Sequence, residues 1–192
     1  SPKNKEESRD KTGIKGNPVF LWVGNLDDNK DPITALKAFI HVFEHLPDAK
    51  LHMIYRLDHG EREVRNFINQ HPLLINNVVM HGSKSRNKLS DYYNSDDYFI
   101  SASHKEGSGY AAIEAMSCGV IPILTDIPSF LSLTKNGRVG VIFEKGNSQM
   151  LFEQIMKLMK KNISIESKRV ISHFQQYLSF KAIAQDAEKV YN

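Results

Sequence analysis

Two glutamates, Glu106 and Glu114, stand eight positions apart in the stretch HKEGSGYAAIEAMSCG, residues 104–119. Between them the turn at 107–109 reads GSG, and glycine permits a tight turn and a close approach of the backbone to a ligand. Tyr110 then opens a predicted helix whose first N–H groups have no partner within the helix, so this turn is a candidate anion site. A plain strand-to-helix turn uses the same residues, and that structural interpretation stays open.

The predicted helix around Glu114 consists largely of small side chains, Ala111, Ala112 and Ala115, and ends at Gly119. Small residues let the helix pack closely on a sheet, where a carboxylate is costly to bury unless it accepts hydrogen bonds. Bonds to a charged acceptor contribute about 1.5–3 kcal/mol each. Paired sugar hydroxyls would satisfy Glu114, and so would water on a solvated helix face; the residues alone leave both open.

A second candidate site is the loop GNLDDNKDP, which follows the first predicted strand and begins at Gly24. Lys30 stands just before a helix N-terminus, where a lysine suits a phosphate group, although an exposed loop lysine is the alternative. Asp27, Asp28 and Asp31 surround this lysine. The expected capping role of Asp31 and the presence of Lys30 make a metal site here unfavourable.

Other polar residues near predicted strand ends carry less chemistry. His81 and His104 could hydrogen-bond a ligand, but a lone histidine at a strand end is more often structural. Asp96 and Asp97 precede a strand, and we interpret them as a helix end and not as a metal site. No P-loop, no G-x-G-x-x-G after a strand, and no serine or cysteine nucleophile with an evident base is visible.

The elements that must position these residues alternate along the chain. Continuous apolar runs predict buried strands at 19–24, 50–55, 77–82, 98–103, 120–125 and 140–144. Helices are predicted from Pro32 to the residue before Pro47, and at 61–70, 86–94, 109–118, 147–161, 164–176 and 178–191. This alternation predicts an α/β fold with a doubly wound parallel sheet of about six strands, in which ligands bind beyond the carboxyl ends of the strands.

Composition limits the class of protein. The chain has 192 residues, 41% of them hydrophobic and 24% charged, which is ordinary for a globular domain. Its 25 basic and 22 acidic side chains give no concentrated basic face of the kind that binds nucleic acid. The single cysteine, Cys118, fits a reducing compartment, and no apolar run approaches the length of a membrane span. We therefore expect a cytoplasmic location.

The two ends of the chain differ from its middle. Residues 1–17 are polar without periodicity, which predicts a linker or disordered lead-in, and a linker at this place suggests a preceding domain. After residue 161 the pattern predicts helices alone, so we expect residues 162–192 to pack on the domain at 18–161. A basic cluster lies around the boundary at residue 161: Lys157, Lys160, Lys161, Lys168 and Arg169. Such spacing is more often a solvated helix face, and the alternative is a peripheral contact with an anionic surface at the inner face of the membrane.

Three blocks of sequence resemble one known family. "WVGNLDDNKDPITALKAF", "SDYYNSDDYFISASHKEGSGYAAIEAMSCGVIPILTD" and "GVIFEKGN" are similar to motifs of the C-terminal, donor-binding domain of retaining glycosyltransferases of the GT-B fold, called glycosyltransferase group 1 or family 4. The resemblance covers about residues 18–161. Its most specific part is the E-x7-E arrangement followed by AMSCGVIPI.

The resemblance implies a function and a role for each matching residue. The family transfers a sugar, with retention of anomeric configuration, from a nucleoside diphosphate sugar bound between two Rossmann-like domains, usually without a bound metal. By resemblance the catalytic residues would be Lys30, which would face the diphosphate, and Glu106, which would lie by the transferred sugar. Glu114 would bind the ribose hydroxyls. The turn residues Gly107, Ser108 and Gly109 would contact sugar and phosphate. The remaining residues expected at the donor site are Tyr110, next to this turn, and Gly24 and Asn25 in the first loop.

The chain also departs from the family pattern. Many relatives have an arginine directly after the first-strand glycine, where this chain has Asn25, and we hypothesise that Arg56 at the end of the second strand supplies the missing charge. The acceptor would bind mainly to an N-terminal domain, so we expect this chain alone to bind nucleotide sugar and transfer nothing. The alternatives are a noncatalytic binding or scaffold module of the same fold, or another GT-B sugar enzyme such as an epimerase.

Overall fold

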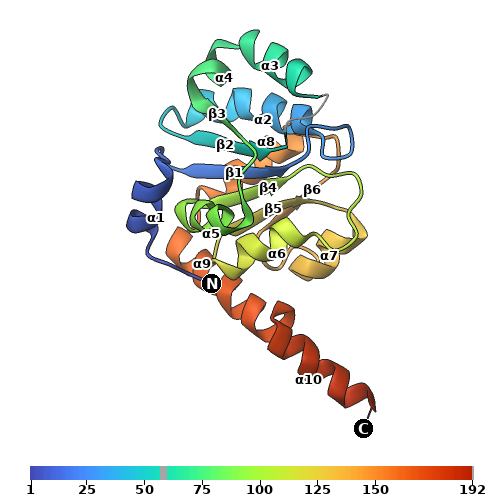
Figure 1. The fold of residues 1–192 in the computed structure, drawn as a ribbon. Helices are drawn as coiled ribbons and strands as arrows, with labels where there is room; N and C mark the ends of the chain where they lie inside the picture. The colour runs from blue at the N-terminus through green and yellow to red at the C-terminus, as the bar shows by residue number, and fades with distance from the viewer. Residues whose placement is uncertain (57–59, 192) are drawn as a thin grey trace.

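The centre of the molecule is a parallel sheet in a computed structural model that describes residues 1–56 and 60–191 (Figure 1). Six strands lie in the order β3-β2-β1-β4-β5-β6, and every neighbouring pair is parallel. Their bounds are Val19–Gly24 for β1, Lys50–Tyr55 for β2, Val78–Gly82 for β3, Tyr98–Ser101 for β4, Ile121–Thr125 for β5 and Val141–Phe143 for β6. The predicted six-stranded, doubly wound α/β fold is confirmed.

Side chains of each strand alternate between two apolar layers, because successive residues of a strand point to opposite faces of the sheet. In β1, Phe20 and Trp22 belong to one core cluster and Val19 and Leu21 to the other. All four are at most 1% exposed. Both faces of this strand are therefore buried, which explains why the strand is a continuous apolar run in the sequence.

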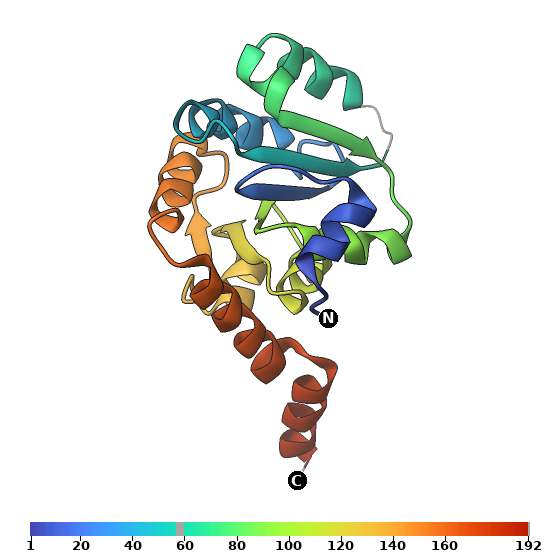
Figure 2. The same cartoon turned by 90° about the vertical axis from the view of Figure 1, so that its left-hand side faces the viewer.

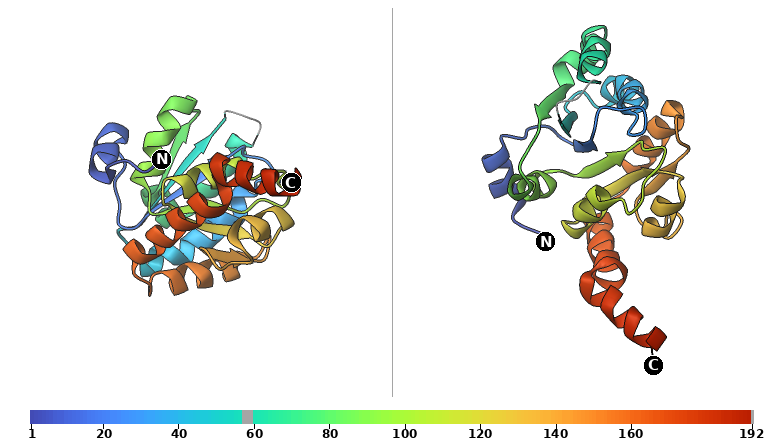
Figure 3. Two further views of the ribbon diagram at one scale, coloured as in Figure 1. Left: turned by 90° about the horizontal axis from the view of Figure 1, so that it is seen from below. Right: turned by 45° about the vertical axis from the view of Figure 1, so that its right-hand side comes forward.

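Helices cover both faces of the sheet. The cluster around Phe20 and Trp22 is covered by α2 (Pro32–His45), α3 (Glu61–Asn69), α4 (Pro72–Asn77) and α8 (Ser148–Leu158). The opposite cluster is covered by α5 (Arg86–Ser95), α6 (Tyr110–Ser117) and α7 (Pro128–Thr134), and α1 (Lys5–Thr12) packs beside α5. Figure 2 and the right-hand view of Figure 3 show these two helical layers from other sides.

Helix α2 begins as its sequence predicts. The carboxylate of Asp31 accepts a hydrogen bond from the backbone N–H of Thr34 at 3.0 Å, and Pro32 occupies the first turn. The helix ends at His45, shortly before Pro47. The cap and the proline fix where α2 starts, and hence where the preceding loop with Lys30 must end.

The lead-in contains a helix that the sequence did not predict. Instead of lacking regular structure, residues 1–17 include α1, whose Lys5 and Arg9 side chains contact Asp97 at 2.6 and 3.2 Å. Helix α1 is polar on all sides, so its hydrophobic pattern gave no helical signal; long-range ion pairs hold it on the domain instead. The short helices α4 and α7 were also not predicted. The division of the chain into domains stays a prediction.

The C-terminal part is helical, as predicted. Helix α9 (Ile163–His173) places Val170 in the core, and a π-helical turn η1 (Phe174–Leu178) leads into α10 (Phe180–Tyr191). Helix α10 extends away from the rest of the molecule in Figures 1 and 2 and in the right-hand view of Figure 3, and Phe180 at its start is 95% exposed. Residue 192 lies outside the described residues. Within the part of the chain described, no helix has the length and apolar character to cross a membrane.

Candidate functional site

The strand order creates one point where ligand binding is favoured. From β1 the chain proceeds outward to β2 and β3, and then returns to place β4 on the other side of β1. In open parallel sheets, loops that leave such a pair of strands in opposite directions open a crevice at their carboxyl ends. Here those two loops are the one after β1, which carries Lys30, and the one after β4, which carries Glu106.

Lys30 and Glu106 form an ion pair across this crevice. The Nζ atom of Lys30 contacts Oε1 of Glu106, and the two side chains are 23% and 17% exposed. The hydroxyl of Ser103 donates a hydrogen bond to the same Oε1 atom at 2.9 Å. Two residues that stand far apart in the sequence thus meet at the predicted edge of the sheet, with their charges partly shielded from water.

Three further hydrogen bonds join the two loops. The backbone N–H of His104 donates to the carbonyl of Asn29 at 2.8 Å, and the Asn29 side chain donates to the carbonyl of Lys105 at 3.1 Å. The Nε2 atom of His104 lies 3.0 Å from Oδ2 of Asp31, the residue that caps α2. His104, for which a structural role was the more common interpretation, therefore ties the loop after β4 to the start of α2.

The loop after β1 is shaped around the lysine. A Cβ atom on Gly24 would lie 3.2 Å from Cγ of Lys30 and 3.1 Å from the Trp22 ring, so a glycine here leaves room for the lysine stem. Asp27 accepts a hydrogen bond from the backbone N–H of Lys30 at 2.8 Å. Asp27 and Asp31 thus use their carboxylates to fix the loop and the helix start.

The turn after β4 delivers a helix N-terminus to the same crevice. Gly109 precedes α6 with φ 63°, a left-handed conformation that favours glycine, and a Cβ atom there would lie 2.9 Å from Phe130. The turn borders a cavity of about 430 Å³ lined by Lys30, Glu106, Gly107, Ser108, Gly109 and Tyr110 among others. Tyr110 is 74% exposed at the first position of α6. The predicted turn residues therefore do meet Lys30 and Glu106.

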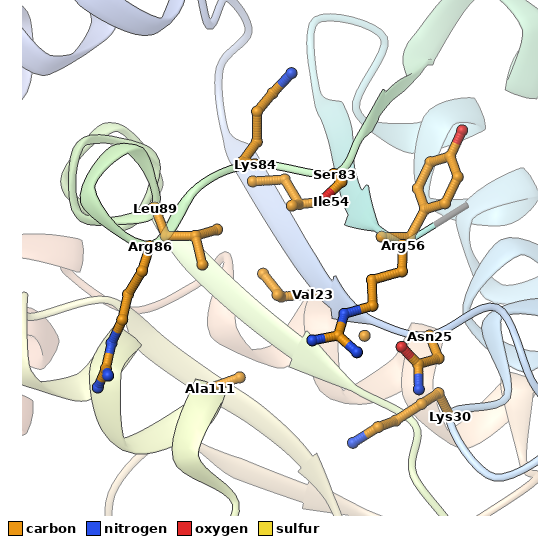
Figure 4. A pocket seen from close by; sticks show the side chains of 12 residues that line it. Val23, Asn25, Lys30, Ile54, Arg56, Ser83, Lys84, Arg86, Leu89 and Ala111 are labelled. Atoms are coloured by element: carbon orange, nitrogen blue, oxygen red, sulfur yellow. The ribbon is translucent and has the colours of Figure 1, made fainter. Parts of the chain in front are cut away.

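A second cavity, of about 510 Å³, adjoins the first along Lys30 and Ala111. Its lining includes Asn25 and four cationic side chains, Lys30, Arg56, Lys84 and Arg86. Figure 4 shows Arg56 extending from the end of β2 toward Asn25 and Lys30, whereas Lys84 points away from them. Arg56 is exposed and forms no ion pair with the residues that the structure describes. The cavity is therefore suited to an anion.

Glu114 lies beside the crevice and not inside it. Its side chain is 38% exposed, and Oε1 is 3.7 Å from a guanidinium nitrogen of Arg86. It lines a smaller cavity of about 220 Å³ that shares Arg86 and Leu89 with the cationic one. Burial raises the pKa of the neighbouring Tyr93, and the charge of Glu114 raises it further. Glu114 is thus neither fully solvated nor buried. Both interpretations of this residue, a ligand of sugar hydroxyls and part of a solvated helix face, stay open.

The sequence alone did not single out Lys84 and Arg86. Both belong to the segment SKSR, residues 83–86, which follows the edge strand β3, and Arg86 begins α5. The rule that pointed to the loops after β1 and β4 applies equally to this one. No glycine-rich turn marks it, and only the folded chain shows that it reaches the same cavity.

His81 has a partner that the sequence did not indicate. Its Nε2 atom lies 2.8 Å from Nδ1 of His52, which is 3% exposed, and the two rings stack. Burial, and then the charges of His52 and Lys84, lower the pKa of His81 to about 4. Burial also lowers the pKa of His52. Both rings are therefore neutral at neutral pH, so one donates a hydrogen bond to the other, and we interpret the pair as structural.

The family comparison agrees with these features. The family model described as "Glycosyl transferases group 1" matches residues 4–175. The chain belongs to this family. It is 32% identical over 141 residues to the GDP-mannose:cellobiosyl-diphosphopolyprenol alpha-mannosyltransferase of Xanthomonas oryzae pv. oryzae, an alignment that covers 73% of this chain and 37% of that protein.

Solved structures of glycosyltransferases share the fold. The C-terminal domain of a group 1 family glycosyltransferase (LpcC) from Francisella tularensis superposes with a TM-score of 0.83 at 19% identity, covering 93% of this chain and 95% of that one. HepE of Anabaena, solved in complex with UDP and glucose, gives a TM-score of 0.77 at 20% identity over 100% of this chain and 53% of its own. This group 1 glycosyltransferase chain thus spans between about a third and a half of the longer relatives it matches.

Proposed function

We propose that this chain is the donor-binding half of a retaining glycosyltransferase, which transfers a sugar from a nucleoside diphosphate sugar to an acceptor such as a polysaccharide or glycolipid. The observation that carries the proposal is the contact between Lys30 and Glu106 at the carboxyl ends of β1 and β4. A cation, an acid and a helix N-terminus meet there beside an open cavity. These are the groups needed to bind a sugar joined to a diphosphate.

In this proposal the diphosphate is bound by fixed positive groups. Lys30 and the N–H groups at the start of α6 face the two phosphates, with Gly107 and Gly109 allowing their close approach. Arg56 supplies the charge that Asn25 lacks, because it reaches the same cavity beside that residue. Such preorganised donors stabilise the negative charge that develops on the leaving diphosphate, so no bound metal is required.

Glu106 and Glu114 serve two different parts of the donor. Lys30 and Ser103 both contact Oε1 of Glu106, and none of the hydrogen bonds among the described residues uses Oε2, which leaves that atom for a sugar hydroxyl. Glu114 accepts the ribose hydroxyls, which requires them to replace its long contact with Arg86. Ser108 and Tyr110 complete the turn around the sugar.

The whole protein is proposed to include an N-terminal domain that binds the acceptor. The relatives support this, because the alignments cover only 37% and 50% of two curated glycosyltransferases and 53% of HepE. The donor of the Xanthomonas relative is named as GDP-mannose, and HepE was solved with UDP, so both nucleotides are candidates for this chain. Transfer takes place at the cytoplasmic side, and the chain alone transfers nothing.

Titration calorimetry of this chain with UDP, GDP and ADP and their sugar conjugates tests the proposal. We expect one nucleoside diphosphate to bind at millimolar concentration or below, and Arg56→Ala to weaken it about tenfold, the loss of one charged hydrogen bond. Lys157→Ala, which removes an exposed cation from α8, is the matched control and leaves affinity unchanged. Absence of binding by every nucleotide would contradict the donor site, and an unchanged affinity in Arg56→Ala would remove that residue from it.

A further inference from the structure

Two successive residues after β4, Ser103 and His104, hold the ion pair of the candidate site from opposite sides. We propose that they are positioning residues: Ser103 orients the Glu106 carboxylate toward the sugar, and His104 fixes Lys30 against the diphosphate through Asp31 and Asn29. This inference rests on the proposed function and goes beyond it, because neither residue contacts the donor in that proposal.

Ser103 is held in a single orientation. Its side chain is 0% exposed, and its hydroxyl lies 2.9 Å from Glu106 Oε1 and 2.9 Å from the Ser101 hydroxyl. A carboxylate can only accept, so the one proton of Ser103 goes to Glu106 and the Ser101 hydroxyl must donate to Ser103. The Thr125 hydroxyl, from β5, donates to the Ser103 carbonyl at 2.6 Å and fixes its backbone. This buried chain of hydroxyls determines which oxygen of Glu106 is occupied.

His104 acts on the other partner of the ion pair. Its side chain contacts Asp31 at 3.0 Å, and its backbone N–H contacts Asn29 at 2.8 Å, so it holds the residues on both sides of Lys30. Asp31 in turn caps α2 with its other carboxylate oxygen. His104 thereby joins the loop after β1, the start of α2 and the loop after β4 into one unit.

The benefit of this arrangement is preorganisation. A lysine side chain has several rotatable bonds, and fixing it in the binding geometry before the ligand arrives avoids the entropic cost of ordering it on binding. The same reasoning applies to the carboxylate of Glu106, whose supporting contacts come from the rigid strand end. Removing either support should therefore weaken the binding of the part of the ligand that the supported residue contacts.

Calorimetry with a nucleoside diphosphate and with its sugar conjugate separates the two roles. We expect Ser103→Ala to weaken binding of the sugar conjugate about fivefold, the loss of about 1 kcal/mol, and to leave binding of the bare diphosphate nearly unchanged. His104→Ala should weaken the binding of both ligands by a similar factor. His104→Gln, which keeps a hydrogen-bond donor toward Asp31, should restore part of the affinity. If the role of Ser103 were merely structural, Ser103→Ala would change the affinities for the two ligands by the same factor.

Matched controls come from the same chain. Ser95→Ala removes a hydroxyl that is also 0% exposed but lies just before β4, at the opposite end of that strand. His41→Ala removes a histidine–carboxylate contact of the same 3.0 Å length, with Glu44, on the surface of α2. Both controls should leave nucleotide affinity unchanged. The proposal is overturned if Ser103→Ala and His104→Ala change affinity no more than these controls.

A second measurement decides the proposal even if the wild-type chain binds no nucleotide, the result that would contradict the proposed function. Nuclear magnetic resonance relaxation at the Lys30 Cε and Nζ positions reports the mobility of that side chain without any ligand. We expect the mobility of Lys30 to rise in His104→Ala, and the mobility of the Glu106 side chain, measured in the same way at its Cγ position, to rise in Ser103→Ala. Both should stay unchanged in Ser95→Ala and His41→Ala. Equal mobility in all four variants would show that neither residue positions the ion pair.

Discussion

Strand β4 carries acidic residues near both of its ends, and the two ends have opposite properties. At the amino end, Asp97 accepts hydrogen bonds from Lys5, Arg9 and the backbone N–H of Val19, at 2.6, 3.2 and 2.8 Å. At the carboxyl end, Glu106 pairs with Lys30 but keeps one oxygen open beside a cavity of about 430 Å³. An acidic residue paired with a cation is therefore not enough to define a ligand-binding site.

The difference comes from the direction of the strands. At the amino end, α1 lies over the edge of the sheet and supplies the cations that satisfy Asp97. At the carboxyl end the loops leave in opposite directions, and the N-terminus of α6 points into the opening. The amino end should accordingly contribute to stability and the carboxyl end to binding, and substitutions can separate these two effects.

The largest expected effect is on stability, at the amino end. Asp97→Ala should lower the free energy of unfolding by about 3 kcal/mol, because it removes three hydrogen bonds to a carboxylate that is only 9% exposed and leaves its cations unpaired. Urea unfolding measures this loss. Nucleotide affinity of the variant, measured well below its unfolding midpoint, should equal that of the wild type; a large loss of affinity would mean that the two ends are not independent.

Lys30→Ala should have the reverse effect. Losing the cation that we propose to face the diphosphate should weaken nucleoside diphosphate binding by about ten- to a hundredfold. Stability should change by about 1 kcal/mol or less, because partly exposed ion pairs contribute little. Calorimetry and urea unfolding of the same preparation check both statements, and Lys50→Ala, which removes a lysine at the start of β2, serves as the control for charge.

A pH-dependent effect is expected from Asp96. Its carboxylate is 2% exposed with no hydrogen-bond partner among the described residues, and burial, reinforced by the charge of Asp97, raises its pKa well above the ordinary value of 3.8. The folded state then holds the proton more tightly than the unfolded state. The wild type should therefore lose stability as the pH rises from about 4 through the folded-state pKa.

Asp96→Asn removes this titration. The difference in unfolding free energy between variant and wild type should shift in favour of the variant as the pH rises, by about 1.4 kcal/mol for each pKa unit of the wild-type shift. Urea unfolding from pH 4 to pH 8 measures the shift. A difference that stays constant over that range would show that Asp96 titrates alike in both states.

The smallest expected effect is that of Glu114→Gln. If Glu114 accepts ribose hydroxyls, the variant should bind a nucleoside diphosphate about fivefold more weakly, the loss of about 1 kcal/mol, and bind pyrophosphate as the wild type does. Because Glu114 is 38% exposed and its contact with Arg86 is long, little change in stability accompanies the substitution. If binding of the nucleoside diphosphate and of pyrophosphate weakened equally, Glu114 would act at the phosphates and not at the ribose.

Much of this arrangement could be predicted from the sequence. The strands are continuous apolar runs, and β1 and β2 have the bounds that these runs predict. Lys30, Glu106 and the turn at 107–109 were recognisable because each follows a strand of an open parallel sheet. The contact between Lys30 and Glu106 was not predictable from spacing, since it depends on β4 lying next to β1, which the order of elements along the chain does not determine.

Other features depend on tertiary contacts that leave no local pattern. Helix α1 is polar on all sides and is held by ion pairs to Asp97. Helices α4 and α7 have six and seven residues, too few for a helical period to appear. Lys84 and Arg86 follow an edge strand, and only the folded chain shows that they line the same cavity as Lys30.

The most direct test of the difference between the two ends is a map of amide chemical shifts in this chain during titration with UDP and with GDP. We expect perturbed signals from residues 24, 25, 30, 56, 83, 84, 86 and 106–111, which line the two cavities at the carboxyl end. Signals from α1 and from 95–97 should stay in place. Perturbations centred on the amino end, or none with either nucleotide at millimolar concentration, would contradict a donor site at the carboxyl ends of β1 and β4.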